Sequence, residues 1–213
     1  MHNCPMPDSN PISAWKALKQ GNERFVSGTP LHPSQGSADR AKLVDGQHPT
    51  AAVFGCGDSR TAAEIIFDQG LGDMFVVRTA GHVIDSAVLG SLEYAVGVLG
   101  VPLVVVFGHE SCGAVKATID ALDNGTVPPG FIRDVVERVS PSILAGRREG
   151  LTTVDELEGR HVVETGSLLM QRSRIISEAV EAGRCAIVGV TYKLADGDIK
   201  LQSTVGDVGD GVG

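Results

Sequence analysis

Short apolar runs alternate with segments of helical periodicity through most of the chain. Five runs have the length of strands and are rich in β-branched residues; they span 51–54, 74–78, 103–107, 186–192 and 199–203. Apolar residues recur every three or four positions in the segments between them, which predicts helices over 62–67, 86–99, 112–125, 132–140 and 153–183. Pro141 is expected to interrupt the fourth of these helices.

Near-continuous apolar strands that are joined by helices are typical of a parallel sheet covered on both faces. The last two strands differ, because the turn Asp196-Gly197-Asp198 between them is a hairpin signal. The pattern therefore predicts an α/β fold in which a mostly parallel central β-sheet is flanked by helices.

The beginning of the chain has a different pattern. Asn10 and Pro11 form a cap and first-turn signal, after which apolar residues at helical spacing predict an amphipathic helix. The segment 28–47 is rich in Gly, Pro, Ser and His and predicts an extended arm with one helical turn near 40–44. This amino-terminal helical arm, 1–47, is suited to wrap a second subunit. The tail 206–213 is expected to be disordered.

Length and charge limit the classes of function. With 213 residues and 42% hydrophobic content, the chain is expected to form a single domain over 1–213. A net charge of -8 argues against nucleic acid and anionic membranes as partners, because phosphate binding needs basic surfaces. The chain begins without a signal-peptide pattern, and its longest apolar run is too short to span a bilayer. A cytoplasmic protein is therefore expected.

Metal-binding residue types follow two of the predicted strands directly. Cys56 comes after the first strand, and His109 and Cys112 come after the third. The carboxyl ends of strands in an open α/β sheet are where ligands bind, so these side chains are expected to meet there. Two thiolates and one imidazole suit Zn²⁺, and three protein ligands leave a fourth position open, as in catalytic zinc sites. Asp58 lies near enough to approach the metal or its bound group, and Arg60 is placed to hold the Asp58 carboxylate away.

An open zinc site predicts a particular chemistry. The metal lowers the pKa of a water in the fourth position, so a hydroxide nucleophile becomes available near neutral pH. The simplest substrate for it is a small electrophile that needs no large pocket.

The two motifs, Cys-x-Asp-x-Arg from Cys56 and Gly-His-x-x-Cys-Gly from Gly108, resemble those of the β-class carbonic anhydrases. The segments Phe67–Gly81 and Ser91–Val96 also resemble parts of that family. The resemblance implies one zinc ion per chain and the reversible hydration of CO₂ to bicarbonate. It also implies that Asp58 becomes a metal ligand only in a closed form of the site.

Further positions carry roles that only the resemblance implies. Gln47 matches a glutamine that hydrogen-bonds substrate, and Phe75 and Tyr94 match aromatic pocket residues that some family members take from the partner subunit. Gly113 is placed to offer a backbone N–H to bicarbonate at the start of its helix. A homodimer is then the smallest active unit, and a homotetramer is also compatible.

Some family members have a second, inhibitory bicarbonate pocket formed by a Trp, an Arg and a Tyr. Arg78 and Tyr192 match two of these residues, but Val53 stands at the tryptophan position, which argues against that pocket in this chain.

Two alternatives remain open at this point. An enzyme of the same fold can hydrolyse CS₂ or COS by the same attack, and a non-catalytic protein can use zinc or bicarbonate for regulation. The other candidate groups have ordinary structural interpretations: Asp155, Glu156 and Glu158 as a solvated helix start, His48, His82 and His161 as surface or packing residues, and Cys185 as a buried hydrophobe.

Overall fold

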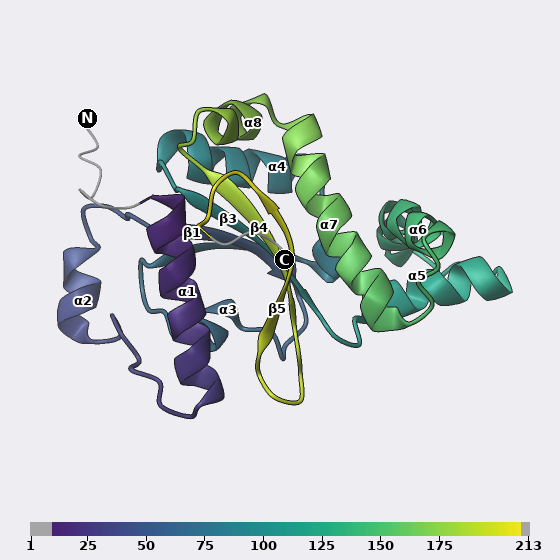
Figure 1. Cartoon of the computed structure of the whole chain (residues 1–213), viewed down its shortest axis with the longest axis horizontal. Coiled ribbons are helices and arrows are strands. Elements are labelled where there is room, and N and C mark those ends of the chain that lie inside the picture. Colours follow the sequence, from purple (N-terminus) through teal and green to yellow (C-terminus); the bar gives the residue numbers. More distant parts are fainter. Residues whose placement is uncertain (1–9, 210–213) are drawn as a thin grey trace.

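The computed structural model describes residues 10–209, which form a central five-stranded sheet between layers of helices (Figure 1). The strands lie in the order β2-β1-β3-β4-β5, and the first four are parallel while β5 is antiparallel to β4. The expected mostly parallel sheet with a final hairpin is confirmed. The strand bounds are β1 Ala51–Cys56, β2 Met74–Thr79, β3 Leu103–His109, β4 Ala186–Tyr192 and β5 Ile199–Val205.

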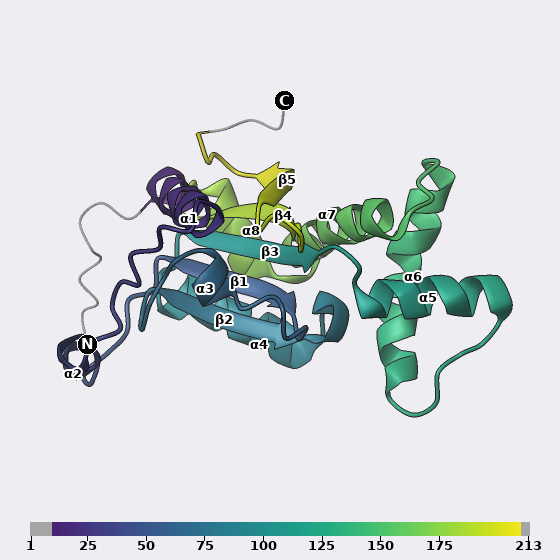
Figure 2. The ribbon, with the colours of Figure 1, turned by 90° about the horizontal axis from the view of Figure 1, so that it is seen from below.

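The helices cover both faces of this sheet and extend past its ends. Their bounds are α1 Pro11–Val26, α2 Ser37–Lys42, α3 Ala63–Ile66, α4 Ser86–Glu93, α5 Gly113–Asn124, α6 Ile132–Arg148, α7 Val154–Arg172 and α8 Arg174–Glu181. In the view of Figure 2, α2 lies at one end of the sheet and α5 and α6 project from the opposite end. No helix among residues 10–209 is long and apolar enough to cross a membrane.

Successive side chains of the buried strands point to opposite faces of the sheet, so they contribute to two separate hydrophobic cores. Phe54 and Val106 belong to the core shared with α4, α7 and α8, whereas Val53 and Val105 belong to the core shared with α1 and α3. Trp15 and Leu18 of α1 are almost fully buried in the second core. A third cluster forms where α5, α6 and α7 pack around the ends of β1 and β3.

Several expected element bounds change in the structure. The helix predicted to stop at Pro141 continues as α6 to Arg148, because its buried face continues through Ser142 and Ile143 on the far side of the proline. The single helix predicted over 153–183 is wrong, since Ser173 has extended backbone angles and caps α8 through its hydroxyl. The disordered tail predicted from 206 does not include 206–209, where Val208 is buried in the core; 210–213 lie outside the described residues.

The strands that carry the motifs are longer than their apolar runs. β1 continues to Cys56 and β3 continues to His109, so both residues are the last of their strands. The helix after β3 begins at Gly113 and ends at Asn124, within one residue of the predicted 112–125 at each end, with the left-handed Gly125 as its cap. Cys56 and His109 are therefore held by regular strand backbone and not by loops.

Candidate metal centre

The ends of β1 and β3 bring the three predicted ligands together. Cys56 and His109 end strands that are hydrogen-bonded neighbours, and Cys112 is the N-cap residue of α5. One donor atom from each residue lies within 4.8 Å of the other two, and all three residues are buried. The predicted convergence at the carboxyl edge of the sheet is therefore found.

A tight turn after β2 completes the surroundings of the Cys56 sulfur. The Gly81 N–H donates a hydrogen bond of 3.3 Å to Cys56 Sγ. Gly81 has a φ of 61°, and a Cβ at this position would lie only 2.5 Å from the Cβ of Ala114 on α5. Glycine is thus required here both by the backbone angle and by the close approach of α5.

The orientation of His109 leaves one ring nitrogen available. Its Nδ1 lies 2.8 Å from the carbonyl oxygen of Glu110, which can only accept, so Nδ1 carries the proton. Its Nε2 is buried and has no hydrogen-bond partner among the described residues. A buried nitrogen lone pair beside two cysteine sulfurs fits Zn²⁺, and a backbone carbonyl on the other nitrogen is the usual partner of a zinc-bound histidine.

Asp58 is held beside this cluster by Arg60. The Arg60 Nε and Nη2 donate to the two carboxylate oxygens at 2.9 and 2.7 Å, and the Arg60 backbone N–H donates to Oδ1 at 2.9 Å. These bonds hold the pKa of Asp58 well below its usual range. Asp58 Oδ2 lies 3.9 Å from His109 Nε2, so the carboxylate stands next to the cluster without belonging to it.

The two cysteine side chains change each other's pKa in opposite directions. A hydrogen bond from Cys112 lowers the pKa of Cys56, and the same bond raises the pKa of Cys112. Burial disfavours the charged form of His109, but the neighbouring Cys56 sulfur and the nearby Glu158 carboxylate raise the pKa of His109 overall. A cation at this point would satisfy the lone pairs of all three side chains.

Arg78 stabilises the loop that follows β1 through hydrogen bonds to its backbone. It donates to the carbonyl oxygen of Cys56 at 2.8 Å and to that of Asp58. Val53 and Tyr192, the other positions compared with the inhibitory pocket, are buried in one apolar cluster.

Three buried polar residues behind the cluster were not assigned to the site from the sequence. Glu158 is completely buried, its Oε1 accepts the His109 backbone N–H at 3.2 Å, and burial raises its pKa to about 7. His82 lies 3.6 Å from Glu158, and its ring is 4.3 Å from that of His161. The interpretation of Glu158 as solvated is wrong, although its spacing of four from the buried Val162 already indicated an inward face.

The predicted substrate residues do not all reach this cluster. Gly113 starts α5 directly beside Cys112, as expected. Phe75 pairs with Ala52 in the sheet, four residues before Cys56, which corresponds to about 13 Å along the strand. Tyr94 contacts Phe75 with a ring separation of 6.3 Å, and the exposed Gln47 precedes β1. Gln47, Phe75 and Tyr94 therefore lie toward the other end of the sheet in the same chain.

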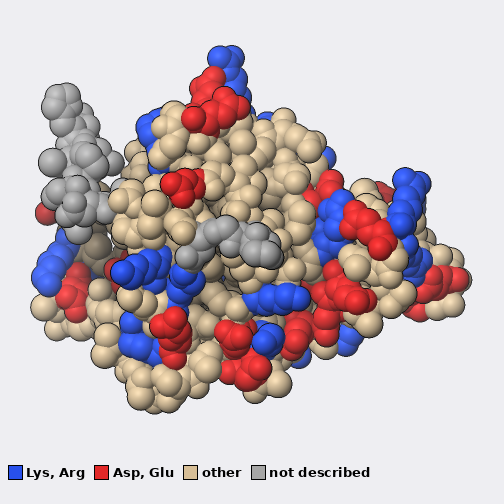
Figure 3. Space-filling model, viewed as in Figure 1, with Lys and Arg blue, Asp and Glu red and all other residues tan. Residues whose placement is uncertain are grey.

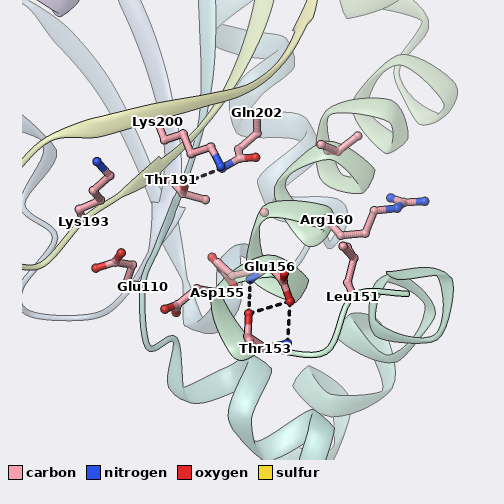
Figure 4. Close-up of a pocket in the computed structure, with 13 residues that line it drawn as sticks. Glu110, Leu151, Thr153, Asp155, Glu156, Arg160, Thr191, Lys193, Lys200 and Gln202 are labelled. Atoms are coloured by element: carbon pink, nitrogen blue, oxygen red, sulfur yellow. Dashed lines mark hydrogen bonds between the residues drawn. The ribbon is translucent and has the colours of Figure 1, made fainter. Parts of the chain in front are cut away.

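A cavity of about 480 Å³ lies at the back of the cluster, between β4, β5 and the start of α7. Figure 4 shows Lys200 and Gln202 along one side of it, with Glu110 and Asp155 along the other. The buried Glu158 separates this cavity from His109. On the face of the molecule in Figure 3, acidic and basic side chains are interspersed.

Comparisons with known proteins agree with this geometry. The sequence profile of the carbonic anhydrase family matches residues 51–199. The chain is 68% identical to a carbonic anhydrase of Mycolicibacterium smegmatis over 96% of its own length and 100% of that protein. It is 66% identical to carbonic anhydrase 2 of Mycobacterium tuberculosis, over 97% and 100% of the two chains.

Solved structures share the fold. A tetrameric β-carbonic anhydrase of Sordaria macrospora superposes with a TM-score of 0.70 at 22% identity, and the match covers 89% of this chain and 96% of that one. With the profile match and the mycobacterial relatives, this places the chain in the family of the β-carbonic anhydrases.

Proposed function

We propose that this protein catalyses the reversible hydration of CO₂ to bicarbonate and a proton, as a zinc-dependent carbonate dehydratase. The observation that carries the proposal is the buried Cys56-His109-Cys112 cluster, whose three donors leave one tetrahedral position open. Its mycobacterial relatives, at 66–68% identity over their full length, are named carbonic anhydrases.

The roles of the residues follow from their geometry. Zinc, when bound, lowers the pKa of a water in the open position from about 15.7 towards neutrality. The Asp58 carboxylate is placed to accept a hydrogen bond from that water and so to direct an oxygen lone pair at the carbon of CO₂. Arg60 keeps Asp58 ionised and oriented through its paired hydrogen bonds. The new C–O bond gives bicarbonate, and the water's proton leaves to solvent.

Asp58 also has a second possible position. In the structure it is paired with Arg60, and a zinc ion held by Cys56, His109 and Cys112 would keep its fourth position free for water. We assign Asp58 as a metal ligand only in a closed form, in which the carboxylate turns away from Arg60.

Substrate binding requires residues from a second chain in this proposal. Gly113 offers the first N–H of α5, where the helix dipole favours an anion such as bicarbonate. Gln47, Phe75 and Tyr94 lie too far along the sheet to reach the cluster of their own chain. In a homodimer, each chain contributes these three residues to the metal site of its partner. A homotetramer, the state of the Sordaria macrospora protein, is compatible with the same arrangement if it is built from two such dimers.

A reducing compartment suits this chemistry. The three described cysteines, Cys56, Cys112 and Cys185, are free, and two of them are required as thiolates. We therefore place the protein in the cytoplasm.

The experiment that tests the proposal is stopped-flow CO₂ hydration by the purified protein at alkaline pH, with zinc measured on the same sample. Fast hydration with about one zinc per chain is expected. COS and CS₂ are assayed in parallel, because they would react by the same attack. Full zinc with hydrolysis of COS or CS₂ alone would transfer the assignment to those gases, and full zinc with no turnover of any gas would indicate a binding role.

A further inference from the structure

Two side chains on one face of α7 reach the backbone beside two of the metal ligands. Glu158 and His161 are three residues apart, so they point the same way from the helix, and both are buried. Glu158 accepts the His109 N–H, as described above. His161 Nε2 lies 2.9 Å from the carbonyl oxygen of Gly81, the residue whose N–H donates to Cys56 Sγ. His161 is thus two hydrogen bonds away from a metal ligand.

The two hydrogen bonds of His161 define its tautomer. The Gly81 carbonyl can only accept, so Nε2 carries the proton and donates. Nδ1 then accepts from the hydroxyl of Ser142, whose oxygen lies at 2.8 Å. Burial lowers the pKa of His161 to about 4, which keeps the ring neutral and both bonds intact near neutral pH.

The turn that His161 holds has an unfavourable backbone. Gly81 and His82 have successive left-handed φ angles of 61° and 39°, and His82 carries a large side chain there. The His82 ring packs at 4.3 Å from that of His161, and neither of its nitrogens has a hydrogen-bond partner among the described residues. His161 therefore supports this turn in two ways, by stacking on His82 and by donating to Gly81.

We propose that His161 is a positioning residue of the metal centre, which keeps the Gly81 N–H directed at the Cys56 sulfur. An N–H···S hydrogen bond withdraws electron density from a thiolate. Without it, the Cys56 sulfur carries more electron density, which shifts the charge-transfer band. It also binds a proton more tightly in competition with the metal and is less well oriented, so metal affinity falls. This role rests on the proposed ligand set of Cys56, His109 and Cys112.

The test uses cobalt as a spectroscopic substitute for zinc in the full-length protein. The thiolate-to-cobalt charge-transfer band reports the electron density on the cysteine sulfurs. In His161→Phe, this band is expected to shift to lower energy, and zinc affinity in competition with a chelator is expected to fall about 10- to 100-fold. His161→Gln, whose amide N–H can still donate towards Gly81, is expected to recover part of both effects.

Two further variants separate positioning from general destabilisation. Ser142→Ala removes only the hydroxyl that fixes the tautomer, so a smaller shift in the same direction is expected. Leu169→Ala weakens the same helix eight residues away from His161 and is expected to leave the band unchanged.

The outcomes distinguish this inference from the function on which it rests. A normal wild-type band that is unchanged in both His161 variants and in Ser142→Ala would overturn the positioning role. An equal shift in Leu169→Ala would also overturn it. A wild-type protein that binds cobalt without any thiolate band would overturn the ligand set itself, and the positioning role with it.

Discussion

The two ends of the sheet differ in how many of their proposed site residues one chain brings together. At the carboxyl end, Cys56, His109 and Cys112 are buried with their donor atoms within 4.8 Å. Toward the amino end, Tyr94 is 46% exposed and Gln47 is also exposed. One chain thus brings the three candidate metal ligands together by itself, whereas two of the proposed substrate residues face outward.

Topology explains this difference. Parallel strands β1 and β3 end at the same edge of the sheet, so residues that follow them converge without help from another molecule. Phe75 is kept away from this edge, because the parallel pairing of β2 with β1 places it beside Ala52, four residues before Cys56. A flexible loop could bring a side chain back across this distance, but a residue within a strand cannot move in this way.

The largest expected effect tests the carboxyl end alone. Cys112→Ser is expected to lose zinc and to reduce CO₂ hydration to background, because serine is a poor zinc ligand at neutral pH. Cys185→Ser is the matched control, since Cys185 is also buried and free but lies in the apolar core. Zinc content and stopped-flow hydration are measured on both. Full zinc in Cys112→Ser, or loss of zinc in Cys185→Ser, would contradict the ligand assignment.

The second-largest expected effect distinguishes orientation of the attacking water from metal binding at the carboxyl end of the sheet. Asp58→Ala and Arg60→Ala are each expected to keep zinc and to lose on the order of a hundredfold in kcat/KM, because the attacking water is no longer oriented. The double variant is expected to lose little more than either single one, since the two side chains act as one unit. Full additivity of the two losses would show that Arg60 acts independently of Asp58.

Mixed dimers of two variants test whether residues at the amino end of the sheet serve the metal site of the partner chain. Gln47→Ala is expected to weaken hydration by removing a substrate contact, whereas Cys112→Ser removes the metal. If Gln47 serves the partner's site, a dimer with one chain of each kind has one intact site.

Co-expression of the two variants then restores about a quarter of the wild-type sites for random pairing. If Gln47 served its own chain, no intact site would form and activity would stay at the level of the Gln47→Ala chains alone. In the purified mixed dimer with one tag on each chain, only the Gln47→Ala chain holds zinc. Its hydration rate per zinc therefore equals the wild-type rate in the first arrangement and the Gln47→Ala rate in the second.

The sequence was most informative where chemistry coincided with a strand end. Cys56 and His109 follow runs too apolar for anything but buried strands, so their convergence could be predicted from topology alone. His161 and Glu158 could not be assigned to the site in this way. They lie on a helix far along the chain, and periodicity can place a polar residue on the inner face of that helix without showing which residues it contacts there. Similarly, Ser173, where the predicted helix breaks, donates a hydrogen bond to Glu93, a residue 80 positions earlier that periodicity does not connect with it.

The smallest expected effect concerns stability, and it tests the buried layer behind the carboxyl end. Burial lowers the pKa of His161 from 6.5 to about 4, so between these values the unfolded chain binds more protons than the folded one. Stability from this residue is therefore present above pH 6.5 and is lost as pH falls towards 4, by about 2 kcal/mol between pH 7 and pH 5. His161→Gln has no such group and should reduce the pH dependence of the unfolding free energy by this amount.

Urea unfolding at the two pH values, with zinc held constant, measures this difference. Other titrating groups contribute to both proteins, so the wild-type and variant slopes are subtracted. His48→Gln, a change at an exposed histidine, is the matched control and should leave the wild-type slope in place. Equal slopes for wild type and His161→Gln would mean that His161 is not held neutral in the folded protein. In that case Nδ1 would carry a proton as well, and the ring could not accept from Ser142 in the way that the geometry requires.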